Sequence, residues 1–170
     1  MRFYSGKRGL AVAYASFFSF FLFFSIPIGG VYFTIRNGNT FAKLGEIISN
    51  KPAEVSHAAG QFKLAFLFVL LMVILTGLMY LLTAKSREMA FRFLTIIFGS
   101  YTIIALGYKV IVSAAMTTAI SKLDPGPLKE QAPAVAKAFT NNFVIFGVAG
   151  ALLSLASLII GLTGKSKKES

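Results

Sequence analysis

Four long apolar segments alternate with polar segments along this chain of 170 residues. The apolar segments cover residues 9–33, 62–83, 91–117 and 141–163. Each is long enough to cross the hydrocarbon core of a bilayer, which needs about 20 predominantly apolar residues. The pattern predicts an all-α fold, an integral membrane four-helix bundle, with residues 1–170 forming a single transmembrane domain.

Two longer polar segments, 34–61 and 118–140, are expected to be the outer connections, and each contains a short helical extension. Residues 40–50 carry apolar side chains at helical spacing, which is typical of an amphipathic helix at the membrane surface. Pro52 favours the first position of a new helix. The sequence Asp-Pro-Gly-Pro at residues 124–127 is a strong turn signal, and a second helical extension follows it.

Basic residues are concentrated at one set of segment ends. The formal net charge is +11, and cytoplasmic loops of membrane proteins carry an excess of Lys and Arg close to the spans. The N-terminal segment, the 83–92 turn and the tail at 164–170 contain nine such residues: Arg2, Lys7, Arg8, Lys85, Arg87, Arg92, Lys165, Lys167 and Lys168. Both chain ends are therefore predicted to be cytoplasmic. The positive net charge is explained by the Lys and Arg residues that set the orientation in the membrane, so we expect no nucleic-acid partner.

The first apolar segment follows a basic N-terminus, as a signal peptide does. It is longer than a usual signal-peptide core of about 7–15 residues, and no small-x-small cleavage site follows it. We interpret residues 9–33 as an uncleaved signal-anchor span.

Small residues recur four positions apart on the fourth span. This spacing lets helix backbones approach closely in a membrane. The candidate helix-packing residues are Gly147, Gly150, Ala151, Ser154, Ser157 and Gly161. The pattern fits packing onto another span of the same chain and contact between copies equally well.

Lys109 is the only charge that lies deep inside an apolar segment. A basic residue at the centre of a span costs roughly 2.5–3.5 kcal/mol, so such a residue is a functional candidate. It lies about 24 Å along the span by helical rise, from where its side chain can extend to the headgroups. Tyr101 and Tyr108 share one helix face that Lys109 borders, so the three form a candidate polar path.

The remaining side chains exclude several kinds of chemistry. The chain has no cysteine and one histidine, His57, and no span contains Asp or Glu. Cysteine-ligated zinc, thiol redox chemistry and haem held by two histidines are therefore excluded. We expect no catalytic residue, no cofactor and no metal. Asn141 and Asn142 lie at the start of the fourth apolar segment, where they would cap its helix or line a vestibule, and capping is the expected role.

These observations predict a non-enzymatic integral membrane subunit that packs against partner membrane proteins or copies of itself in the lipid bilayer. The alternative is a small oligomeric channel or transporter with a polar path near Lys109. The expected location is the plasma membrane of a bacterium. The C-terminal residues Lys167, Lys168, Glu169 and Ser170 have the K-K-x-x form of an endoplasmic-reticulum retrieval signal, which keeps that membrane as the alternative.

Overall fold

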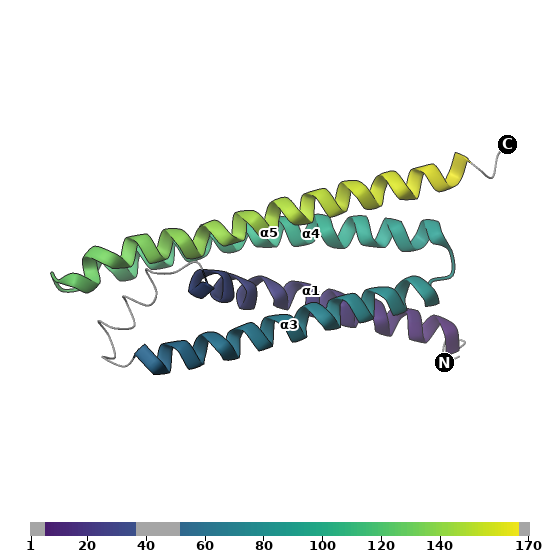
Figure 1. Ribbon diagram of the computed structural model, residues 1–170. Coiled ribbons are helices and arrows are strands. Elements are labelled where there is room, and N and C mark those ends of the chain that lie inside the picture. The colour runs from purple at the N-terminus through teal and green to yellow at the C-terminus, as the bar shows by residue number, and fades with distance from the viewer. Residues whose placement is uncertain (1–5, 37–51, 167–170) are drawn as a thin grey trace, which may run out of the picture. The chain divides into compact units, whose positions relative to one another are not determined.

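The computed structural model describes residues 6–36 and 52–166, and every element within them is an α-helix (Figure 1). The helices are α1 (Gly6–Arg36), α3 (Pro52–Thr83), α4 (Arg87–Ser121) and α5 (Pro127–Ser166). All four are long and apolar enough to cross a membrane. The prediction of an all-helical chain with four such helices is confirmed, and the helices fit a multi-pass membrane protein.

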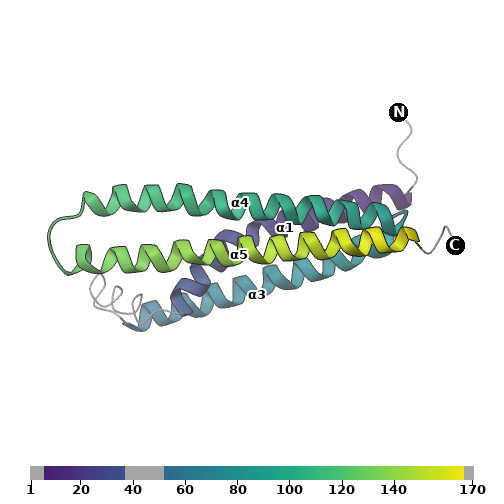
Figure 2. The ribbon, with the colours of Figure 1, turned by 90° about the horizontal axis from the view of Figure 1, so that it is seen from above.

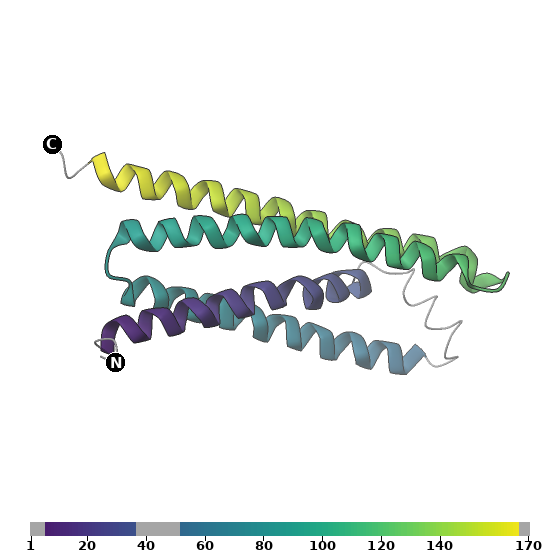
Figure 3. The same ribbon diagram turned by 180° about the vertical axis from the view of Figure 1, so that it is seen from behind.

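Each helix is longer than the apolar segment that predicted it, because its polar flanks continue the helix. The predicted surface helix at 40–50 lies outside the described residues, as do Arg2 and the last four residues of the tail. Within the first unit, consecutive helices run in opposite directions. Figure 3 shows the short turn from α3 to α4 at the same end as the start of α1.

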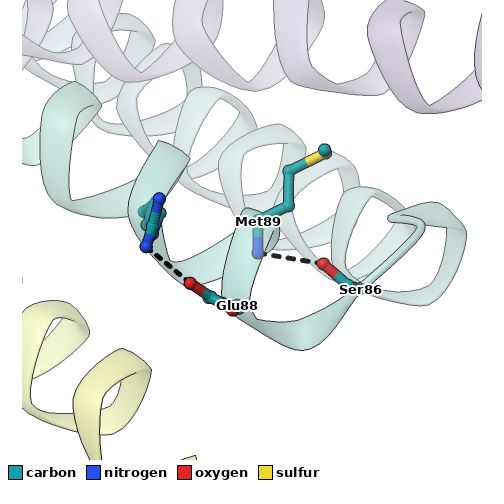
Figure 4. Close-up of polar contacts among 4 residues, drawn as sticks. Ser86, Glu88 and Met89 are labelled. Carbon is teal, nitrogen blue, oxygen red and sulfur yellow. Dashed lines mark hydrogen bonds and ion pairs between the residues drawn. The ribbon is translucent and has the colours of Figure 1, made fainter. Parts of the chain in front are cut away.

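The start of α4 is fixed by Ser86, which acts as its N-cap (Figure 4). The Ser86 Oγ accepts a hydrogen bond from the backbone N–H of Met89 at 3.2 Å. This bond satisfies one of the backbone donors that the first turn of a helix leaves without a partner. Glu88, in the same first turn, forms an ion pair with Arg92 at 2.6 Å on an exposed helix face.

Proline and lysine define the turn between α4 and α5. Pro127 is the first residue of α5, where its missing N–H costs nothing. The Lys129 Nζ donates to the Leu123 carbonyl oxygen at 2.9 Å, and this bond joins the first turn of α5 to the loop before it. The turn predicted from residues 124–127 is confirmed, because α4 ends at Ser121 and α5 begins at Pro127.

The chain forms two compact units, and each unit contains a segment of every helix. Within the described residues, the first unit comprises 6–24, 68–104 and 147–166, and the second comprises 25–36, 52–67 and 105–146.

In the core of the first unit, aromatic rings pack against a helix at a position occupied by glycine. The ring of Phe18 lies edge-on to Phe98, with centroids 5.9 Å apart. A Cβ atom on Gly77 would lie 3.0 Å from the Phe18 ring, so this ring fills the space that a side chain would take. Tyr80 and Phe93 pack nearby with centroids 4.8 Å apart.

In the second unit, aromatic rings also pack against glycine, and here two rings lie close to the same glycine. A Cβ atom on Gly29 would lie 2.5 Å from the Phe146 ring and 2.7 Å from the Phe66 ring. Phe33 contacts both of these rings, at centroid distances of 5.9 and 5.4 Å. Phe143 is 1% exposed and packs edge-on against Phe139. The rings therefore constrain one another and have little room to move away from α1.

Replacing Gly29 by Ala is expected to destabilise the protein. Overpacking of this kind costs about 1–3 kcal/mol, whereas replacing a helix glycine by Ala contributes about 0.5–1 kcal/mol of stability. Thermal unfolding in mild detergent, followed by circular dichroism, is expected to show a lower Tm for Gly29→Ala. Gly60→Ala is the control, because a Cβ there meets nothing within 4 Å. Equal Tm values for the two variants would contradict the close contact.

Candidate functional site

The small-residue pattern of α5 meets α4 inside the first unit, where the two helices run side by side (Figure 2). A Cβ on Gly150 would lie 2.7 Å from the Thr102 Oγ1 and 3.2 Å from the Phe98 carbonyl oxygen. A Cβ on Gly161 would lie 3.3 Å from the Phe91 Cβ. Glycine at these two positions therefore allows the backbones to approach.

Ser154 adds a hydrogen bond between the same two helices. Its Oγ donates to the Thr95 carbonyl oxygen at 2.9 Å. That carbonyl lies in the interior of α4, where its oxygen also accepts the backbone hydrogen bond of the helix. Its second lone pair accepts the Ser154 hydroxyl. A hydroxyl that bonds across helices in an apolar surrounding stabilises the pair and fixes its register.

The other members of the pattern have different surroundings. Gly147 and Ser157 are buried, and Ala151 is exposed. A hollow of about 70 Å³ lies beside Ser157 and Gly161 and is lined from α4 by Phe91 and Thr95. Five of the six predicted packing residues are thus buried or half-buried within one chain.

The three residues of the candidate polar path fall in different units. Tyr101 belongs to the first unit, is buried, and stacks on Phe23 with centroids 6.3 Å apart. Tyr108 and Lys109 belong to the second unit. Tyr108 stacks on Phe143 at 5.8 Å, and the Lys109 side chain is exposed. Neither unit contains all three side chains.

Asn142 is the buried polar residue whose role the sequence did not reveal. Its Nδ2 donates to the Gly30 carbonyl oxygen at 3.2 Å and to the Thr34 Oγ1 at 2.9 Å. Thr34 in turn donates to the Gly30 carbonyl oxygen at 2.7 Å. These bonds connect α5 to α1 within the second unit. An asparagine at the start of an apolar segment is a candidate for such interhelical bonding, and that signal was available in the sequence.

The expected capping role of Asn141 and Asn142 is wrong. Helix α5 begins at Pro127, so both asparagines lie in its interior. The polar stretch after Pro127 continues the helix without interruption. Asn141 is exposed, whereas its neighbour Asn142 is 4% exposed.

The C-terminal half of α4 presents a second set of small residues on a largely exposed face. Gly107, Ile111, Ala114 and Thr118 share one face by their spacing of four, three and four residues. A Cβ on Gly107 would meet nothing within 4 Å. Ile111 is 69% exposed, and Ala114 and Thr118 are exposed as well. This face has the composition of a helix-packing surface, and three of its four residues are exposed.

The described residues contain no group of three or more His, Cys, Asp or Glu side chains that would hold a metal ion.

Asn142→Leu is expected to lower the free energy of unfolding by about 0.6–2 kcal/mol, the range for interhelical hydrogen bonds in membranes. The bond from Thr34 to Gly30 persists in the variant, so the loss is limited to the two bonds between α1 and α5. Unfolding in mixed detergent with increasing dodecyl sulfate measures the difference. Asn141→Leu changes the adjacent exposed residue in the same way and is expected to have little effect. An equal effect of the two variants would argue against the role of the Asn142 amide.

Comparison of the chain with protein-family models, with curated proteins and with solved structures finds no match.

Proposed function

We propose that the protein is a non-enzymatic integral membrane subunit that associates with a partner membrane protein or with copies of itself. The observation that supports this proposal is the uncovered face of Gly107, Ile111, Ala114 and Thr118 on α4. The outer half of α4 is the surface through which association would occur.

Exposed apolar side chains alone do not favour association in a membrane, because lipid tails are as apolar as leucine. Small residues do favour it, since they let two backbones approach and gain van der Waals contact. The same molecule uses this device on α5, where Gly150 and Ser154 contact α4. The face of Gly107, Ile111, Ala114 and Thr118 has comparable residues: a Cβ on Gly107 would meet nothing within 4 Å, and the other three side chains are exposed.

Polar groups on this face are already satisfied, so the face tolerates a dry interface. The Thr118 Oγ1 donates to the Ala114 carbonyl oxygen at 3.0 Å, and beside the face the Thr117 Oγ1 donates to the Ser113 carbonyl oxygen at 2.9 Å. A partner helix that covers them leaves no donor without an acceptor.

The alternative function, a small oligomeric channel or transporter, also requires association. Lys109 is exposed on a single chain, so it would line a polar path only where several copies bring it to a common axis.

The proposed orientation has both chain ends in the cytoplasm, with residues 9–33 as a signal anchor, in the plasma membrane of a bacterium. The support is the concentration of Lys and Arg at the N-terminus, the α3–α4 turn and the tail. The endoplasmic reticulum remains the alternative because of the K-K-x-x ending.

Because the chain has no native cysteine, single-cysteine variants report orientation without background. In intact cells a membrane-impermeant maleimide is expected to label Gly126→Cys, in the α4–α5 turn, directly. Ser86→Cys, in the α3–α4 turn, is expected to react only after the membrane is permeabilised. The opposite order of labelling would reverse the proposed orientation.

A photo-reactive benzoylphenylalanine in place of Ile111 is expected to form protein adducts in native membranes. The matched control is Ile96, which lies on the same helix and is similarly exposed, at 67% against 69%. Position 111 is expected to give several times the adduct yield of position 96, and the adduct mass distinguishes a second copy from another protein. If both positions react with lipid alone, the proposed association surface is wrong.

A further inference from the structure

A large groove lies entirely within the first unit. Its walls come from the first half of α1, the end of α3 and the start of α4. Its volume is about 1230 Å³, which is larger than the roughly 300–1,000 Å³ of a small-molecule pocket. Tyr80, which is buried, packs against Phe93, and both line the groove.

The groove offers an apolar lining despite the hydroxyl groups in it. The Ser16 Oγ donates to the Val12 carbonyl oxygen at 3.0 Å, and the Ser19 Oγ donates to the Ala15 carbonyl oxygen at 2.8 Å. The Thr83 Oγ1 likewise donates to the Met79 carbonyl oxygen at 2.7 Å. These three hydroxyl donors are used within their own helices, so they are not left to orient a polar molecule. The lining suits a flexible hydrocarbon chain.

One wall of the groove carries a positive charge. Lys85 lines the groove from the turn between α3 and α4, where the apolar part of the span ends. Its side chain is exposed, and no ion pair joins it to an acidic residue among the described ones. The nearest acid in sequence, Glu88, pairs with Arg92. An apolar groove with a cation at the span end is complementary to an anionic amphiphile.

We propose that this groove binds an anionic phospholipid, with its acyl chains between α1 and α3 and its phosphate at Lys85. Basic residues beside transmembrane helices attract anionic lipid headgroups, and packing in a groove adds selectivity for the chains. The proposal concerns the first unit and does not depend on the association surface of α4.

The test uses the full-length protein purified in mild detergent, with dioleoyl phosphatidylglycerol and dioleoyl phosphatidylcholine as probes. Native mass spectrometry measures how much of each lipid stays bound. Phosphatidylglycerol is expected to be retained preferentially, and Lys85→Ala is expected to weaken its retention about fivefold. Lys122→Ala removes an exposed lysine from the other turn and is expected to have no effect.

A second pair of variants tests the groove itself. Ala15→Phe fills the groove from α1 and is expected to reduce retention of both lipids. Ala149→Phe adds the same ring to an exposed position of α5, outside the groove, and is the control. The proposal is overturned if the two lipids are retained equally, if Lys85→Ala behaves as Lys122→Ala does, or if Ala15→Phe behaves as Ala149→Phe does. Circular dichroism of each variant confirms that the helices are intact.

Discussion

Close approach of aromatic rings and backbone to glycine is the interaction on which the packing of this protein depends. Helices in a bilayer gain little from the hydrophobic effect when they associate, because lipid is as apolar as their side chains. Helix association must then come from van der Waals contact between surfaces of complementary shape. Gly77, Gly29 and Gly150 each leave a space that a neighbouring ring or hydroxyl occupies at 3.0 Å or less from where a Cβ would lie.

Satisfaction of polar groups is the second constraint, and it follows from the same surroundings. A hydroxyl without an acceptor in hydrocarbon costs several kcal/mol, on the order given by transfer data. Most described Ser and Thr hydroxyls donate to a carbonyl three or four residues earlier in their own helix, as Thr76 does to Met72. Ser154 and Asn142 differ, because they donate to another helix. These two residues therefore add hydrogen bonds between neighbouring helices, α5 to α4 and α5 to α1.

Two surface features take no part in the internal packing described above. One is the small-residue face of α4 in the second unit, and the other is the groove beside Lys85 in the first. They differ in chemistry: the face has small, uncharged residues, which suits another helix, whereas the groove has a volume of about 1230 Å³ and a lysine in its lining, which suits a lipid. A subunit that associates through one unit and holds lipid in the other would have separate surfaces for the two tasks.

The sequence by itself determined the four helices, because apolar segments of this length have one stable form in a bilayer, the helix that satisfies its own backbone. It also located Pro52 at a helix start, since a proline at that position loses no hydrogen bond, and it predicted a helix directly after the turn at residues 124–127. The tertiary structure alone decided which small residues are covered. Spacing shows that Gly150 and Ser154 share a face, and that Gly107 and Ala114 share another, but only the position of a neighbouring helix shows that the first face is packed and the second is open. The burial of Asn142 was also decided by the tertiary structure. Its neighbour Asn141 has the same side chain but is exposed, because α1 packs against the side of α5 that carries Asn142.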